Sequence, residues 1–557
     1  MRTLLKAAAA ILAAVAVYLL FTLPPVPAAA SGLSNPDLEA RTIPGAYHVH
    51  SDRSDGAGSR DEIAAAAARA GLRFIVFTDH GDGMRAPEGP RYAHGVLCLD
   101  GVEISTNGGH YVALDMRPSG YPLGGEAAAV VEDVRRLGGF GIVAHPYSPK
   151  PDLRWTDWAA PIDGLEWLSA DSEWRDESFA RLLRLPFDYL LRPQSALTSI
   201  LDRPGPEMER WQDLMARRPV VALAAHDAHG GLGGSREGGR FPLPAFPSYL
   251  ASFRAFALRA VTASPLTGSP PDDARLVLDA IRRGRVFTAL DGVAGPALLD
   301  FGAAVGSTIA QMGDSLPFED GVELSVRATL PAGGMLALMC GGEEVAKSPT
   351  GELRSRPRVA TACRPEVRAP GAPGMPPVPW IAGNAIHLLS TIIEPVGSEP
   401  LFESSLVLDM LDWVVEKDPE STGVVAAERG AMRLDYTLKA GERTSQYVAA
   451  AADLRPPVPP YDRILFTAEA AAPMRVSVQL RFGGGERWVS SVFVEPDARR
   501  VIIPVEELVR AGDRSTPRPD FRQVTSILFV VDLINALPGS SGWVRISDLA
   551  FGQPVGR

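Results

Sequence analysis

Histidines and carboxylates recur together over one part of the chain. Every histidine except His387 lies between residues 48 and 229. Imidazole nitrogens mixed with carboxylate oxygens are the ligands that zinc, manganese or iron prefer in proteins. The pattern therefore predicts a site for divalent metal ions. The candidate ligands, in chain order, are His48, His50, Asp55, His80, Glu103, His110, His145, Asp227 and His229.

The elements that must position these residues alternate between short apolar runs and amphipathic stretches. His80, His145 and Asp227 each follow an apolar run of the length of a buried parallel strand. Because the C-terminal ends of the strands meet at one face of a β/α barrel, we expect the ligands to converge at one mouth. The expected strands are 74–77, 141–144 and 220–225, and the expected helices are 61–69, 126–137 and 207–217.

The order of the motifs resembles the PHP (polymerase and histidinol phosphatase) superfamily of metal-dependent phosphoesterases. The resemblance covers about residues 44–265 and implies a distorted (β/α)7 barrel that holds two or three divalent ions (Zn, Mn or Fe). It rests on His48-x-His50 with Ser54-Asp55-Gly56, Thr78-Asp79-His80, Glu103 with His110, His145-Pro146 and Asp227-x-His229.

The resemblance also implies how the ligands divide among the ions. His48, His50, Glu103 and Asp227 would bind the first ion, and Glu103 would bridge to a second ion held by His110 and His145. A third ion would be held by Asp55, His80 and His229. Asp55 stands where some members of the superfamily carry histidine, so an oxygen ligand there would weaken or retune the third position.

Clustered divalent ions suit the hydrolysis of phosphoesters, because one ion activates a metal-bound water while the others hold the phosphoryl oxygens. We therefore expect a metal-dependent hydrolase, most simply a phosphoesterase acting on a phosphoric mono- or diester of a small molecule or an envelope polymer. A carboxylic-ester or carbamate hydrolase would use the same site. An alternative of another class is a non-catalytic carbohydrate-binding envelope protein.

Further candidates surround the ligands. Asp79 either orients a ligand from behind or caps a helix, and His226 either donates a proton or is a packed core residue. Lys150 and Arg154 follow His145 closely enough to meet a phosphate oxygen, and solvated loop charges are the alternative. Arg236 lies in a glycine-rich stretch after His229 that is either a flap over the site or an ordinary connection.

The N-terminal 31 residues have the pattern of a signal peptide or of an N-terminal membrane anchor. Arg2 and Lys6 precede an apolar run over residues 7–23, and the alanines at 28–30 form a potential cleavage site. We therefore expect an exported protein, periplasmic or extracellular, that contacts a membrane only through this segment. The net charge of -11 and the lack of a basic block exclude a nucleic-acid partner.

A chain of 557 residues is expected to form two to four domains. We predict a metallohydrolase barrel over 40–268, a small accessory domain with one helix and a β-rich part over 269–395, and a C-terminal β-sandwich or jelly roll over 396–557. The second part resembles the tail of carbaryl-hydrolase-like, exported members of the superfamily. The third resembles jelly-roll carbohydrate-binding modules, so a glycan is a candidate partner there.

Two sets of residues in these later regions leave alternatives open. Cys340 and Cys363 either pair in an oxidising compartment or remain two buried thiols, whereas Cys98 is expected in the core. Tryptophans stack on sugars or fill the core of a β-sandwich. The three tryptophans in question are Trp413, Trp488 and Trp543.

Overall fold

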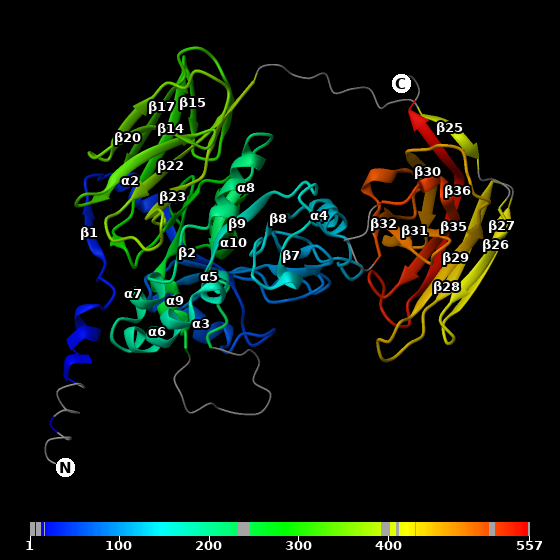
Figure 1. Ribbon diagram of the computed structural model, residues 1–557, viewed down its shortest axis with the longest axis horizontal. Coiled ribbons are helices and arrows are strands. Elements are labelled where there is room, and N and C mark those ends of the chain that lie inside the picture. The colour runs from blue at the N-terminus through cyan, green and yellow to red at the C-terminus, as the bar shows by residue number, and fades with distance from the viewer. Residues whose placement is uncertain are drawn as a thin grey trace.

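The computed structural model describes residues 6, 13–15, 17–231, 246–390, 402–407, 411–428, 430–511 and 518–554. Two bodies are visible, a larger mixed α/β body and a C-terminal β-sandwich (Figure 1). The apolar core divides in nearly the same way, since one cluster runs from Ala30 to Leu388 and takes in Phe493 of the sandwich, while another runs from Met432 to Phe551. Within the described residues, no helix is long and apolar enough to cross a membrane.

A ring of strands surrounds the candidate ligands. β2, β3 and β5 pair in parallel, β5 continues into β6 across Gly101, and β6 to β10 are neighbours in a second sheet. Two single bridges, His80 with Glu103 and Val49 with Ala228, join the two sheets. The ring strands are β2 (Thr42–Val49), β3 (Phe74–Phe77), β5 (Val96–Asp100), β6 (Val102–Thr106), β7 (Gly109–Leu114), β8 (Phe140–Val143), β9 (Gly164–Ser169) and β10 (Val221–Ala225).

Helices pack against these strands from outside. α3 begins with a capping box, in which the Ser59 side chain accepts from the Glu62 N–H and the Glu62 side chain bonds back to Ser59. α4 packs on β7 and β8, and α8 packs on β9. The helices are α3 (Arg60–Arg69), α4 (Ala127–Arg136), α5 (Ala170–Asp176), α6 (Phe179–Leu191), α7 (Pro193–Thr198), α8 (Gly205–Met215) and α9 (Tyr249–Ala255).

The alternation of strand and helix is interrupted at β6 and β7. These strands form an antiparallel hairpin, and β7 also runs antiparallel to β8. Asn107 and Gly108 connect β6 to β7, and a two-residue connection leaves no room for a helix. The hairpin places Ser105 opposite His110, so Glu103 and His110 come from adjacent strands.

The segment that follows extends the first sheet away from the ring. β11 pairs with both β2 and β12, and β12 continues to β23 and β22. Cys340 and Cys363 lie directly opposite each other on β19 and β22, with Cα atoms 4.2 Å apart, and form a disulfide. Cys98 is a buried free thiol. Helix α10 (Pro270–Arg282) lies between β11 and β12 in the chain. Besides β2, β3 and β5, the strands of this sheet are β4 (Arg91–Ala93), β11 (Ala257–Val261), β12 (Val286–Ala289), β16 (Ser315–Pro317), β19 (Met335–Cys340), β20 (Glu343–Ser348), β22 (Ala362–Arg368), β23 (Ile381–Gly383) and β24 (Ile386–Leu389).

Two smaller sheets complete the larger body. Ala28, at the predicted cleavage site, pairs with Ala294, and Ala30 pairs with Pro331. The alanines at 28–30 therefore form the middle strand of a sheet. The strands are β1 (Ala28–Ser31), β13 (Ala294–Gly295) and β18 (Leu330–Pro331) in one sheet, and β14 (Leu299–Val305), β15 (Thr308–Gln311), β17 (Glu323–Ala328) and β21 (Glu352–Ser355) in the other.

The predicted C-terminal β-sandwich is confirmed. Two six-stranded antiparallel sheets enclose a core that contains Phe466, Phe529 and Phe551. One sheet is made of β25 (Phe402–Val407), β27 (Thr422–Glu428), β28 (Ala431–Thr437), β30 (Arg463–Ala470), β33 (Arg499–Pro504) and β36 (Ser541–Pro554). The other is made of β26 (Trp413–Lys417), β29 (Tyr447–Asp453), β31 (Met474–Phe482), β32 (Arg487–Val494), β34 (Val509–Arg510) and β35 (Val524–Asp532).

The three tryptophans of the sandwich do not share one face. Trp488 is buried and packs edge-on against Phe521. Trp413 packs on Phe529, while Trp543 belongs to the opposite sheet and lies under Arg433. A single stacking platform built from all three is therefore absent, and Trp488 is part of the core.

The sandwich is attached to the larger body through Arg475. Its buried guanidinium donates to both carboxylate oxygens of Asp133, at 2.7 and 3.0 Å, and to Glu132 at 2.6 Å. Phe493 joins the core of the larger body, where it stacks on Tyr121. α4 therefore contacts the ring on one side and the sandwich on the other.

Candidate metal centre

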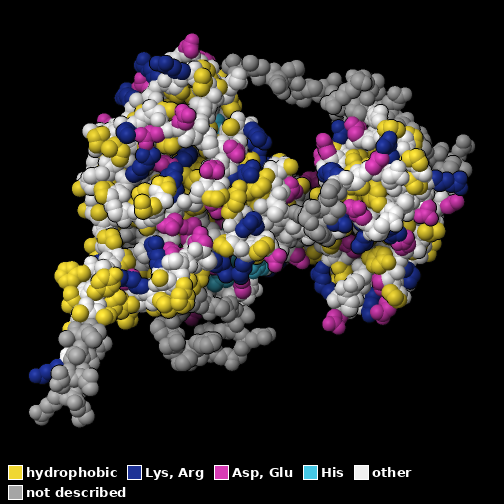
Figure 2. Space-filling model, viewed as in Figure 1, with side chains coloured by type: hydrophobic (Ala, Val, Ile, Leu, Met, Phe, Trp, Pro, Cys, Tyr) yellow, Lys and Arg dark blue, Asp and Glu magenta, His cyan; other side chains and the backbone are white. Residues whose placement is uncertain are grey.

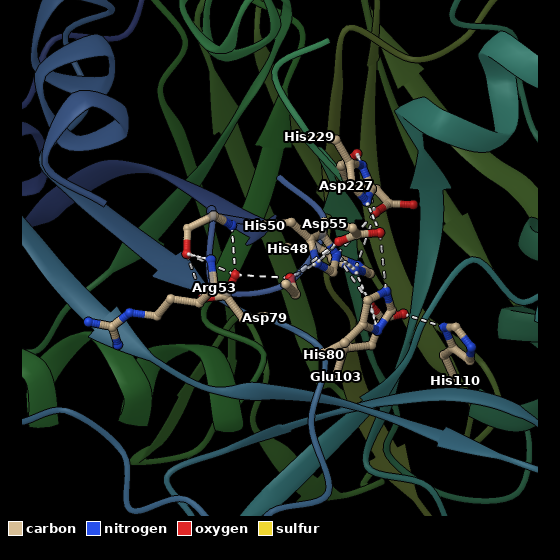
Figure 3. Close-up of polar contacts among 12 residues, drawn as sticks. His48, His50, Arg53, Asp55, Asp79, His80, Glu103, His110, Asp227 and His229 are labelled. Atoms are coloured by element: carbon tan, nitrogen blue, oxygen red, sulfur yellow. Dashed lines mark hydrogen bonds and ion pairs between the residues drawn. The ribbon is translucent and has the colours of Figure 1, made fainter. Parts of the chain in front are cut away.

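Three of the candidate ligands have an unusual backbone conformation. His48, His145 and Asp227 have positive φ angles of 61°, 29° and 42°. Residues other than glycine rarely adopt this region, and such strain gathers at functional sites. All three lie at or just beyond the ends of ring strands. In Figure 3 the side chains of His48 and Asp227 point toward those of the other ligands.

Four donor atoms form the innermost group. His48 Nε2 lies 3.1 Å from His50 Nε2, 3.2 Å from Glu103 Oε2 and 3.5 Å from Asp227 Oδ1. His50 Nε2 lies 3.1 and 3.4 Å from the same two oxygens. Ligands about 2.0–2.2 Å from a shared ion stand roughly 2.8–3.6 Å apart, depending on octahedral or tetrahedral geometry. The spacing of these atoms therefore fits one divalent ion.

A second group gathers on the other oxygen of Glu103. His110 Nδ1 lies 2.7 Å from Glu103 Oε1, and His145 Nε2 lies 3.0 Å from the same atom. Glu103 is almost fully buried, so both of its oxygens face imidazole nitrogens rather than water. With each oxygen facing different imidazoles, Glu103 could contact two ions at once.

The third group faces solvent. Asp55 Oδ2 lies 3.2 Å from His229 Nε2 and 3.6 Å from His80 Nε2. His80 also reaches back to Glu103, with Nδ1 3.3 Å from Oε2. All nine predicted ligands thus lie together, and eight of them, all but His229, belong to overlapping clusters that could hold metal ions. Four such clusters are His48–Glu103–His145, His48–His50–Asp227, His50–Asp55–His80 and His80–Glu103–His110.

The buried carboxylates of this cluster are stabilised only if positive charge lies beside them. Burial alone would raise the pKa of Glu103, but the facing imidazoles of His48, His110 and His145 hold it well below its ordinary value. Burial would lower the pKa of His145, but Glu103 and the other carboxylates raise it to about 9. The carboxylates therefore stay ionised, and their charge is balanced either by protons on the imidazoles or by metal cations.

Glu166 belongs to the site and was missed in the sequence. Its Oε1 lies 2.6 Å from His48 Nδ1, and its Oε2 accepts from the His145 backbone N–H at 2.6 Å. A carboxylate at Nδ1 fixes the proton there and leaves Nε2 of His48 free to bind an ion. One signal was available, because Glu166 is the charged residue of the otherwise uncharged run Gly164–Ser169, whose residues are all buried.

Asp79 lies behind the ligands rather than among them. It accepts hydrogen bonds from the Ser51 N–H at 2.6 Å and from Ser54 Oγ at 3.1 Å, and it forms an ion pair with Arg60. Ser54 Oγ in turn lies 3.3 Å from His50 Nδ1. Asp79 therefore fixes the loop that carries His50 and Asp55, and the cap of α3 is Ser59 instead.

His226 lies beside the ligands but points elsewhere. Its ring stacks on Phe256, and its two nitrogens lie 3.0 and 3.3 Å from the carbonyl oxygens of Phe256 and Tyr47. Burial lowers its pKa to about 4. This geometry is that of a packed, neutral core residue, which was one of the two interpretations of the sequence.

A cavity of about 430 Å³ opens beside Asp55, Asp227 and His229. Lys150 is one of the residues that line this cavity. Arg154 is exposed and donates to the Ser148 carbonyl oxygen, so it is held in its own loop. Arg236 and Arg240 lie outside the described residues.

Comparisons with known proteins do not assign this site. The chain matches no family model, and no curated protein matches it. Its structural neighbours are carbohydrate-binding modules. The family 11 module of the cellulosomal cellulase Lic26A-Cel5E of Clostridium thermocellum is 18% identical with a TM-score of 0.22, over 28% of this chain and 97% of the module. A family 29 carbohydrate-binding module is 12% identical with a TM-score of 0.19, over 28% of this chain and 90% of the module.

Proposed function

We propose that the protein is a metal-dependent hydrolase, most simply a phosphoesterase. The observation that carries the proposal is Glu103, a buried carboxylate with one oxygen at the His48–His50–Asp227 group and the other at His110 and His145. Divalent ions of zinc, manganese or iron suit this donor set. When bound, such ions act as Lewis acids and make a hydroxide available near neutral pH.

Other residues of the chain orient the ligands and contact the substrate. Glu166 orients His48, and Asp79 holds the loop of His50 and Asp55. Lys150, at the cavity wall, is placed to meet an anionic oxygen of the substrate. The apolar wall of the same cavity excludes water from the rest of the substrate. Each task is needed whether the scissile bond is a phosphoester, a carboxylic ester or a carbamate.

We further propose that the ring is a barrel of the PHP type and that the protein is exported. The closure of the strands by two bridges and the position of the ligands at strand ends support the first proposal. The Cys340–Cys363 disulfide supports the second, because such bonds persist in oxidising compartments.

The test is metal analysis of the purified chain together with a substrate panel. Phosphomonoesters, phosphodiesters, carboxylic esters and a carbamate are assayed with Mn²⁺, Zn²⁺ and Fe²⁺, for the native chain and for Asp227→Asn. We expect bound metal and hydrolysis of a phosphoester, both lost in the variant. Hydrolysis that persists in Asp227→Asn, or a chain that binds no divalent ion, would contradict the proposal.

A second candidate function is glycan binding by the sandwich. The observation that favours it is a cavity of about 670 Å³ along β29 and β31, lined by Tyr447, Gln479, Arg481 and Arg487. An aromatic ring beside amide and guanidinium donors suits sugar hydroxyls. Binding of soluble β-glucans that survives metal removal and is lost in Tyr447→Ala would support this function.

A further inference from the structure

One face of α6 is apolar and open to solvent. Phe179, Leu183 and Leu190 are 77%, 67% and 80% exposed, and with the exposed Pro186 they follow the i, i+4, i+7, i+11 spacing of one helical stripe. A different stripe of the same helix is buried, because Leu185 packs against α7. The outer stripe is more apolar than a surface that faces water usually is, so it indicates an interaction surface.

The N-terminal segment enlarges this apolar surface. Arg184 of α6 donates to the carbonyl oxygens of Leu19 and Thr22, at 3.3 and 2.7 Å, and Arg192 donates to that of Pro24 at 2.7 Å. These bonds hold the end of the N-terminal helix against α6. Its exposed apolar residues therefore adjoin the stripe. They are Tyr18, Leu20 and Phe21, at 63%, 55% and 86% exposure.

We propose that these side chains form a bilayer-docking face, defined as Tyr18, Leu20, Phe21, Phe179, Leu183 and Leu190. Figure 2 shows hydrophobic side chains gathered where the N-terminal extension leaves the larger body. The occupant is the interfacial region of a lipid bilayer, in which a helix lies with its apolar stripe buried.

The charges around the docking face indicate what kind of bilayer contact this is. Arg181 pairs with Glu177, and Arg184 pairs with Asp188. The chain as a whole carries a net charge of -11. Attraction to anionic headgroups is therefore small, and burial of apolar area drives docking. Binding to neutral lipid should consequently change little with salt.

The residues behind α6 form part of the wall of the metal-site cavity. Leu185 of α6 and Ala196 of α7 pack with Ile200, and Ile200, Trp174 and Leu201 line the cavity beside Asp227. The α6 part of the docking face and this apolar wall are thus connected by one small apolar cluster. Resting on the proposed function, this placement assigns the substrate to the amphiphiles, with the ester at the metal centre and an apolar chain along the wall.

Docking is tested by a depth measurement on the full chain. Leu183→Cys gives an exposed thiol for an environment-sensitive dye, because Cys98 is buried and the other cysteines are bonded. Ile309→Cys is the matched control, since Ile309 is 82% exposed and lies on strand β15, outside the docking face. With phosphatidylcholine vesicles containing brominated lipid, we expect quenching at position 183 at least threefold above that at position 309, and nearly equal in 0.05 and 0.5 M NaCl.

Equal quenching at both positions would overturn the docking face. A doubled mass in solution with position 183 shielded and unquenched would also overturn it, by showing that a second copy covers the stripe.

The substrate class is tested with two phosphodiesters, one water-soluble and one embedded in vesicles. Leu183→Ser with Leu190→Ser should lower turnover of the embedded substrate at least tenfold and leave that of the soluble one within twofold, because two buried leucines supply much of the docking energy. Ile309→Ser with Val424→Ser is the control pair, and both of its residues are exposed elsewhere. Equal turnover of the embedded substrate by the two double variants would contradict the substrate assignment. A native chain that hydrolyses neither substrate but inserts into vesicles would contradict phosphodiester hydrolysis and leave the docking face standing.

Discussion

Two buried polar clusters of this protein neutralise their carboxylates in different ways. At the interface between the ring and the sandwich, the cation is part of the chain, because Arg475 bonds to Asp133 and Glu132. At the metal centre, the described residues supply no lysine or arginine partner for Glu103 or Asp227, and imidazoles take that place.

The difference separates a structural cluster from a functional one. A cluster that contains its own cation has its charge balanced as soon as the chain folds, and it stabilises one arrangement of the two bodies. A cluster of carboxylates and imidazoles is complete only when protons or metal ions enter it. Removing one partner should therefore damage stability at the interface and metal binding at the ring.

The largest effect is expected for Glu103→Gln. The amide removes the negative charge of the carboxylate whose two oxygens face the two inner groups, so phosphoester hydrolysis should fall by roughly four orders of magnitude, or more than about 5 kcal/mol. Metal content by mass spectrometry should fall with it. The control is Asp61→Asn, an exposed carboxylate on α3 of the same body. Unchanged metal content in Glu103→Gln would refute the bridging role.

The matching change at the interface is Arg475→Met. This change leaves the buried carboxylate of Asp133 without its main partner, although Tyr121 and Arg136 still contact it. Removing one partner of a buried ion pair usually costs roughly 3–5 kcal/mol of unfolding free energy, and we expect a cost near the low end of that range. Denaturant unfolding measures it. Arg481→Met removes a half-exposed pair with Glu416 and should cost less than about 1 kcal/mol. Comparable losses in the two variants would show that burial of the Arg475 network is unimportant.

A smaller effect is expected for Glu166→Gln. The amide keeps the shape and can still accept from the His145 N–H, but it no longer holds a charge at His48 Nδ1. Metal affinity should fall roughly 10- to 100-fold with the fold intact, as is usual when a carboxylate behind a histidine ligand is lost. Titration of the metal-free protein with Zn²⁺ measures this. An unchanged affinity would mean that Glu166 serves packing alone.

The effect that is smallest near neutral pH concerns a buried imidazole outside the metal centre. Burial lowers the pKa of His387 to about 4, below the ordinary value of 6.5. Between these two values the unfolded chain binds a proton that the folded chain does not, so stability falls as the pH drops. The contribution is about 1.4 kcal/mol per pH unit below 6.5, and none above it. His387→Gln should flatten the unfolding free energy over pH 6.5 to 4. An unaltered slope would contradict the assignment.

Local patterns in the sequence were enough to find the candidate ligands and most of the elements that carry them. The expected helix 61–69 is Arg60–Arg69, and the expected strand 220–225 is Val221–Ala225. Both were predictable because periodicity and capping are local properties. The nine candidate ligands were recognisable by residue type and by the order of their motifs, and the fold brings eight of them into clusters that could hold metal ions, with His229 beside Asp55. The sandwich followed from period-two alternation.

Only the tertiary structure decided which atoms face each other and where the apolar surfaces remain open. Glu166 reaches His48 across 118 residues of sequence, and the β6–β7 hairpin sets Glu103 beside His110. The pairing of Cys340 with Cys363 depended on the register of β19 and β22. The stripe on α6 is apolar in sequence like any core stripe. Its exposure follows from the packing of the other face, which is a property of the folded chain.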